Sequence, residues 1–159
     1  MNQKIILVGK GASGKDCLRK RFEAKGWKYS KSYTTRPMRK NEKNDGDYVF
    51  ISVQEFKSMI EKGEFVEWCM FNDWYYGTPK KEWEESNLLI VTPSGLKQIK
   101  EKMNLENVFV FFLDIDYETR YKRLSSRMDA DKPDRRIKAD EEDFMGFKEY
   151  DCVIKNPDF

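Results

Sequence analysis

Histidine is absent from this sequence of 159 residues, and cysteine is scarce. Without histidine the chain cannot use Ser-His or Cys-His catalysis, and most kinds of zinc site are excluded. The three cysteines, Cys17, Cys69 and Cys152, are odd in number and widely spaced, so they predict neither a disulfide framework nor a zinc site. Free thiols in a reducing compartment are the simplest interpretation.

Long apolar runs and an excess of one charge are also missing. No segment approaches the ~20 apolar residues of a membrane span. Met1 leads within three residues into a strand-like run rather than a signal peptide, so we expect a cytoplasmic protein without a membrane partner. The 30 basic and 28 acidic residues nearly cancel, which argues against nucleic-acid binding. Any anion site must therefore be local.

The sequence does contain short apolar runs that alternate with helical patterns. Buried strands are expected at Ile5–Val8, Leu88–Thr92, Val108–Leu113 and Val153–Ile154. Helical patterns fill residues 14–25, much of 93–107, 117–127 and 135–147. This order predicts one domain of α/β class with a parallel core sheet.

Residues 32–78 interrupt that alternation and look like an insertion with its own small sheet. A strand is expected at 47–51, and Ser52 with Glu55 forms a capping box that opens a helix. Strands at 65–71 and 74–77 are joined by Asn72-Asp73, which is typical of a hairpin. Thr78-Pro79 then predicts another helix with proline at its first position.

The first strand runs into a phosphate-loop pattern. Glycines let backbone N–H groups turn inward toward an anion, the following helix adds its positive end, and a lysine adds a mobile charge. An ordinary glycine-rich turn is the alternative. The last position departs from the pattern, because Asp16 stands where a serine or threonine usually binds Mg²⁺. The loop consists of Gly9, Lys10, Gly11, Ala12, Ser13, Gly14, Lys15 and Asp16.

Two features of the insertion suggest a second nucleotide site. Arg36 and Arg39 flank the rigid Pro37 and can clamp a small phosphate, although their spacing alone favours a solvated basic loop. Glu67 is a lone acid in an apolar strand. It either points to solvent by strand alternation or accepts the N1 and N2 hydrogens of guanine.

A family resemblance emerges from the motifs taken together. Guanylate kinases are similar to this chain over nearly its whole length, most specifically in the middle block. The motifs that carry the resemblance are Ser32-x-x-x-Arg36-x-x-Arg39-x-x-Glu42, Gly46-Asp47-Tyr48, Phe65-x-Glu67-Trp68, Tyr75-Tyr76-Gly77-Thr78 and Tyr150-Asp151-x-Val153-Ile154-x-Asn156.

The resemblance implies a three-layer phosphate-loop fold with a mixed-sheet insertion that binds the nucleoside monophosphate, and a short helical lid. It divides the chain into a core (1–31, 79–126 and 148–159), the insertion (32–78) and the lid (127–147). The implied reaction is phosphorylation of GMP or dGMP by ATP with Mg²⁺. The implied GMP-binding residues are Ser32, Arg36, Arg39, Tyr48, Glu67, Tyr76 and Thr78.

The same resemblance assigns the donor side. The phosphate loop would hold ATP, Asn156 would lie near adenine, and Asp16 would be the candidate metal ligand. The charge of the transferring group would be balanced by Lys15, Arg39, Arg127 and Arg136. Arg120 and Arg123 are left out, because a solvated basic helix face explains them.

Two positions that differ from the family pattern leave alternative functions open. Thr92 stands where the family usually has an aspartate near the guanosine site, so a different nucleoside monophosphate stays open as the acceptor. Asp16 leaves open a non-catalytic module of the guanylate-kinase-like type, which binds phosphopeptides. A monomer and a homodimer both fit the sequence.

Overall fold

The computed structural model describes residues 3–44, 46–126 and 133–159. Its core is a parallel sheet with the strand order β6-β1-β7-β8. The strands are β1 (Lys4–Gly9), β6 (Leu88–Ile90), β7 (Val108–Leu113) and β8 (Cys152–Ile154). The helices are α1 (Lys15–Glu23), α2 (Val53–Glu61), α3 (Lys80–Glu85), α4 (Pro93–Lys102), α5 (Tyr117–Ser126) and α6 (Pro133–Asp143). This arrangement confirms the predicted α/β class with a parallel core sheet.

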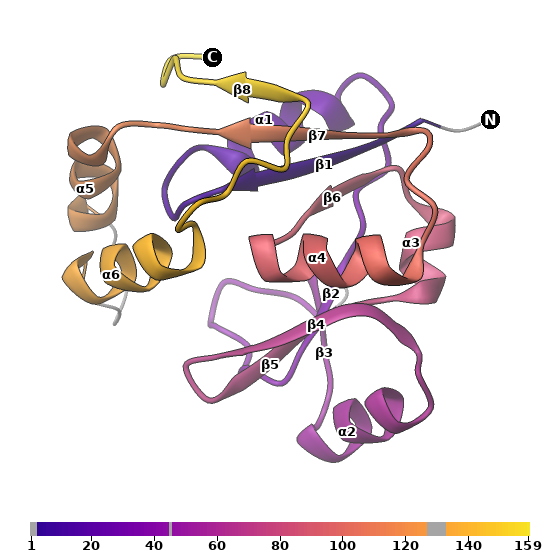
Figure 1. Cartoon of the computed structure of the whole chain (residues 1–159). Coiled ribbons are helices and arrows are strands. Elements are labelled where there is room, and N and C mark those ends of the chain that lie inside the picture. Colours follow the sequence, from indigo (N-terminus) through magenta and orange to yellow (C-terminus); the bar gives the residue numbers. More distant parts are fainter. Residues whose placement is uncertain (1–2, 45, 127–132) are drawn as a thin grey trace.

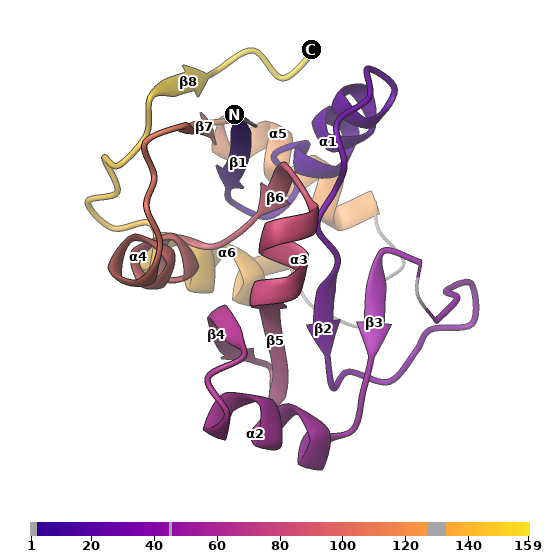
Figure 2. The ribbon, with the colours of Figure 1, turned by 90° about the vertical axis from the view of Figure 1, so that its right-hand side faces the viewer.

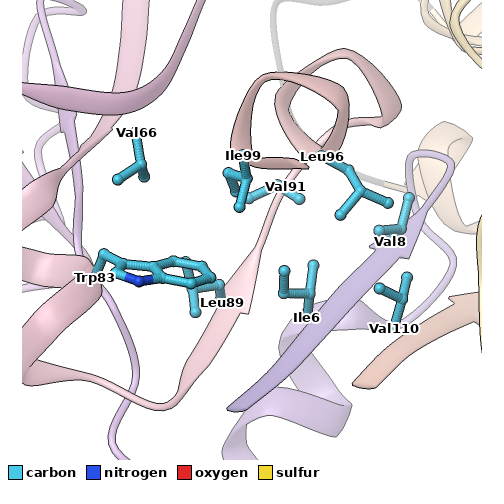
Figure 3. Packing of buried hydrophobic residues seen from close by; sticks show 9 residues of the cluster. All are labelled: Ile6, Val8, Val66, Trp83, Leu89, Val91, Leu96, Ile99 and Val110. Carbon is cyan, nitrogen blue, oxygen red and sulfur yellow. The ribbon is translucent and has the colours of Figure 1, made fainter. Parts of the chain in front are cut away.

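Alternate residues of β1 face opposite layers, as a strand buried on both sides requires. Ile6 and Val8 belong to a buried cluster with Leu96 and Ile99 of α4, and Figure 3 shows these side chains converging between helix and sheet. Ile5 and Leu7 belong to the opposite cluster, against which Leu18 and Phe22 of α1 and other side chains pack. The sheet therefore lies between two helical layers.

The insertion forms a second sheet below the core in the view of Figure 1. Its order is β3-β2-β5-β4, with β2 parallel to β3 and antiparallel to β5. Asn72 and Asp73 both adopt positive φ (54° and 66°), as a tight hairpin turn demands. The strands are β2 (Ser32–Thr34), β3 (Tyr48–Phe50), β4 (Phe65–Phe71) and β5 (Trp74–Pro79).

Strand β4 joins the insertion to the core. Val66 is fully buried and belongs to the same cluster as the core residues of Figure 3. Gln98 of α4 accepts a hydrogen bond from the Trp68 amide (3.1 Å) and donates one to its carbonyl (2.8 Å). Figure 2, turned by 90°, shows β5 directly below α3, between that helix and α2. The base of the insertion is thus fixed to a core helix.

Most predicted elements are confirmed, with differences at their ends. The Ser52 hydroxyl accepts a hydrogen bond from the Glu55 amide (3.1 Å), as a capping box requires. Pro79 precedes α3 as its N-cap instead of being its first residue. The predicted strand at 88–92 ends at Ile90, because Thr92 caps α4 by accepting from the Gly95 amide at 3.0 Å. The division into core, insertion and lid stays a prediction.

Candidate active site

The loop after β1 bends the chain sharply into α1. Ala12 and Gly14 adopt positive φ (61° and 96°), and the Ser13 amide donates to the Lys10 carbonyl at 3.2 Å. Gly14 is the N-cap of α1 and brings no side-chain oxygen to cap the first amides. The helix N-terminus is therefore available to an anion, as in other phosphate-binding loops.

Lys15 folds back over this loop. Its ammonium donates to the carbonyls of Gly9 and Lys10, the second at 3.1 Å. A phosphate oxygen is a stronger acceptor for an ammonium than a peptide carbonyl, so the same side chain can turn to a nucleotide. The pocket here has a volume of about 330 Å³ and is lined by Gly11, Ala12, Ser13, Gly14, Lys15, Asp16, Cys17, Arg123, Arg136, Pro157 and Phe159.

The sequence did not reveal that Arg123 contacts the phosphate loop. The prediction that the arginine face of α5 is solvated is wrong. The Arg123 guanidinium donates to the Ala12 carbonyl in the phosphate loop and to the Pro157 carbonyl, both at 3.0 Å. Arg120 is buried and donates to the Ile115 carbonyl at 3.0 Å. The spacing of three placed both arginines on one helix face, but only the packing of α5 shows that this face points inward.

The segment after β8 returns to the phosphate loop. Phe159 packs so closely on Gly14 that a Cβ there would lie 2.7 Å from the ring. Asn156 is exposed, and its side chain accepts from the Asp158 amide at 2.9 Å. Its neighbours Pro157 and Phe159 line the pocket. This segment therefore supplies an apolar wall beside Asn156.

Asp16 begins α1 together with Lys15 and lines the same pocket. Its side chain is 79% exposed and lies 3.5 Å from the Arg19 guanidinium. Mg²⁺ in nucleotide sites is usually held by one or two carboxylates, water and phosphate oxygens. An exposed carboxylate beside a phosphate loop fits that pattern. No group of three or more possible metal-binding side chains occurs within residues 3–44, 46–126 and 133–159.

The insertion brings the two predicted clamp arginines to one carboxylate. Arg36 is only 6% exposed, and its Nη2 contacts both oxygens of Glu42 at 2.8 and 3.0 Å. The Arg39 Nε lies 4.0 Å from the same carboxylate, with its side chain largely exposed. Glu42 thus holds the buried guanidinium rigidly and keeps the exposed one close to it.

Two tyrosines stand beside this clamp. The guanidinium of Arg36 lies 5.4 Å from the ring centre of Tyr48, whose ring meets Tyr76 edge-on at 6.2 Å. Burial raises the pKa of both phenols above the ordinary value, so both stay neutral and can donate a hydrogen bond. Ser32 lies opposite Tyr48 in the β2–β3 register. These residues form a polar cradle around Arg36.

Glu67 points inward and not to solvent. It is 6% exposed, and the hydroxyl of Thr78 donates to it at 2.7 Å across the β4–β5 ladder. Burial raises the pKa of this carboxyl to about 7, more than the Thr78 bond lowers it. A Cβ on Gly95 would lie 2.8 Å from the other carboxylate oxygen, so the backbone of α4 closes that side. The carboxylate is thereby fixed in one orientation.

Helix α6 contacts both the phosphate loop and the second sheet. The guanidinium of Arg136 lies 5.7 Å from the ring centre of Phe71, at the end of β4. A Cβ on Gly11 would lie 3.0 Å from the Arg136 Nε. Arg136 therefore lies between the phosphate loop and the insertion, where a cation could act on a group passing between them. The predicted Arg127 falls outside the described residues.

Comparisons with known proteins agree with this geometry. A family model described as guanylate kinase matches residues 1–159. The guanylate kinase of Geobacter metallireducens is 37% identical over 141 residues, which cover 83% of this chain and 68% of that relative. The guanylate kinase of Prochlorococcus marinus is 36% identical over 169 residues, covering 99% of this chain and 91% of the relative.

A solved structure is similar as well. The crystal structure of guanylate kinase from Anaplasma phagocytophilum superposes with a TM-score of 0.72 at 28% sequence identity. The match covers 99% of this chain and 79% of that structure. The matched region therefore includes the core sheet, the second sheet and α6.

Proposed function

Because the chain belongs to the guanylate kinase family, we propose that the phosphate-loop pocket binds ATP, that the insertion binds GMP or dGMP, and that the γ-phosphoryl group passes from the first to the second. The observation that carries the choice of acceptor is the pairing of Glu67 with Thr78. A buried carboxylate with one oxygen fixed by a hydroxyl presents adjacent acceptors, which suit the N1 and N2 hydrogens of guanine.

On the donor side, the loop from Gly9 to Asp16 would hold the ATP phosphates through backbone amides and the Lys15 ammonium. Arg123 bridges this loop and the Pro157 carbonyl, so we assign it a positioning role at the ATP site. Phe159 would give adenine an apolar surface, with Asn156 at the rim. Within residues 3–44, 46–126 and 133–159, none of the helices has the length and apolar character of a membrane span.

On the acceptor side, Arg36 and Arg39 would bind the GMP phosphate, assisted by the Tyr48 and Tyr76 hydroxyls. Ser32 would complete the base pocket together with Glu67 and Thr78. Glu42 keeps the clamp assembled in advance, which lowers the cost of ordering two long side chains when GMP arrives.

Transfer then needs alignment and charge balance more than covalent chemistry. Lys15 lies in the phosphate loop, Arg136 between that loop and the insertion, and Arg39 in the insertion, and Arg127 is predicted to join them. No general base is required, because the acceptor is an anionic phosphate oxygen. Closure of the predicted lid would exclude water that would otherwise hydrolyse ATP.

Asp16 would hold Mg²⁺, directly or through water, and bound Mg²⁺ would neutralise charge on the ATP phosphates. Arg19 limits how far this carboxylate repels the nucleotide, since their side chains lie 3.5 Å apart. Thr92 is compatible with this function. Its hydroxyl caps α4 by accepting from the Gly95 amide, and threonine and aspartate are both good N-cap residues, so threonine can replace the usual aspartate in this role.

A coupled ADP-release assay over GMP, dGMP, AMP, UMP, CMP and dTMP tests the proposal. We expect turnover with GMP and dGMP and at most a few per cent of it with the others, because a site built to accept two N–H groups rejects bases that lack them. A preference for AMP or a pyrimidine nucleotide would overturn the assignment of Glu67. ATP binding without any transfer would favour a binding module.

A further inference from the structure

An acidic side chain of α6 contacts the phosphate loop. Asp140, half-buried in the last part of that helix, accepts a hydrogen bond from the Gly11 amide at 2.8 Å. Gly11 is 129 residues earlier in the chain and lies within the loop that lines the pocket. Neither the loop motif nor the roles assigned above include this carboxylate.

The contact is part of a tight docking of α6 on the loop. Ala12, Leu124 and Ile137 form a small buried cluster that joins the loop to α5 and α6. A Cβ on Gly11 would lie 3.0 Å from both the Arg136 Nε and the Asp140 Oδ2. The helix therefore presents a cation and a carboxylate, one turn apart, to the same glycine.

A carboxylate bound to a phosphate-loop amide uses the interaction that a phosphate oxygen would use. Both are anionic acceptors, and a backbone N–H has one hydrogen to give. A carboxylate and a triphosphate next to each other would also repel. The two cannot share this donor, so one must leave when the other binds.

We propose that Asp140 is an internal competitor of the ATP phosphates, which occupies the Gly11 amide until ATP displaces it. The inference rests on the proposed role of the loop as the ATP site. The contact between Asp140 and Gly11 would make the position of α6 depend on whether ATP is bound. Because Asp140 and Arg136 share one helix, displacing the carboxylate repositions the arginine at the moment ATP arrives. The apparent Kd for ATP is then the intrinsic Kd divided by the fraction of molecules in which Asp140 has left the loop.

The test is isothermal titration of the full chain with ATP in the absence of GMP. Asp140→Asn and Asp140→Ala are compared with wild type and with Glu141→Gln, which removes the same charge from the exposed neighbouring residue. We expect Asp140→Ala to lower the Kd for ATP about three- to tenfold, the range of one ordinary net hydrogen bond, because Asp140 is only half-buried and partly solvated. Asp140→Asn should fall in between, since an amide oxygen still accepts, and Glu141→Gln should change little.

The amide resonance of Gly11 provides a second readout, because it should shift in Asp140→Ala without nucleotide and not in Glu141→Gln. An unchanged or raised Kd in Asp140→Ala, or an equal drop in Glu141→Gln, overturns the competitor role and leaves the proposed function intact. An unmoved Gly11 resonance also overturns it. If neither wild type nor variants bind ATP or phosphorylate GMP, the proposed function fails as well.

Discussion

The buried carboxyl of Glu67 makes a testable link between stability and pH. Burial raises its pKa from 4.5 to about 7 in the folded chain. A carboxyl with a raised folded-state pKa binds its proton more tightly in the folded than in the unfolded chain. Its contribution to stability is therefore present below about pH 4.5 and is lost as the pH rises through about 7.

The magnitude follows from the shift of about 2.5 units, which is 7 minus 4.5. At ~1.4 kcal/mol per unit, the free energy of unfolding should fall by about 2–3 kcal/mol between about pH 5 and pH 8 on account of this group. Glu67→Gln removes the titration, since glutamine stays neutral and its oxygen can keep the Thr78 bond. The variant should therefore gain stability relative to wild type as the pH rises.

Urea unfolding followed by tryptophan fluorescence, without nucleotide, measures the effect at both pH values. Glu64→Gln is the matched control, because Glu64 is exposed just before the same strand. The same Glu67→Gln variant should bind GMP far more weakly while binding ATP normally. If the stability difference between Glu67→Gln and wild type is the same at both pH values, the carboxyl does not titrate as its burial requires.

Three further substitutions test other parts of the site. Glu42→Gln should raise the KM for GMP about five- to thirtyfold and leave that for ATP unchanged, since it loosens both clamp arginines by about 1–2 kcal/mol; equal losses for both nucleotides would contradict this. Gly95→Ala gains ~1 kcal/mol of helix propensity yet should weaken GMP several-fold, because its Cβ would lie 2.8 Å from the Glu67 carboxylate; unchanged steady-state kinetics would refute the contact. Lys15→Ala should lower ADP release by about 10²-fold or more with an unaltered circular dichroism spectrum, and normal turnover would remove Lys15 from the mechanism.

The elements that the sequence predicts well are those set by local chemistry. The Ser52 cap, the Asn72-Asp73 turn and the continuous apolar strands each depend on residues close in the chain. Element ends were less predictable. The strand predicted at 88–92 ends at Ile90, because the Thr92 hydroxyl accepts a hydrogen bond from the Gly95 amide and thereby caps α4.

The candidate site shows the same division. The inward orientation of Glu67 stayed open in the sequence, because strand alternation alone does not say which face meets the core. In the sequence Arg123 resembles a solvated cation. Its partners are carbonyls of the phosphate loop and of the segment after β8, which are distant in the chain and leave no local signal. Contacts between distant segments, such as Asp140 with Gly11, have no local signal at all.

Strand β4 limits how the enzyme can be recombined with its relatives. Val66 and Phe65 are both buried, and the Lys102 ammonium reaches the Phe65 carbonyl at 3.3 Å. A graft that exchanges residues 32–78 as a block would transplant part of the hydrophobic core along with the acceptor pocket. Junctions that keep residues 65–68 of the host would leave that core unchanged, so such chimeras should resist urea better than those exchanged from residue 32 to residue 78.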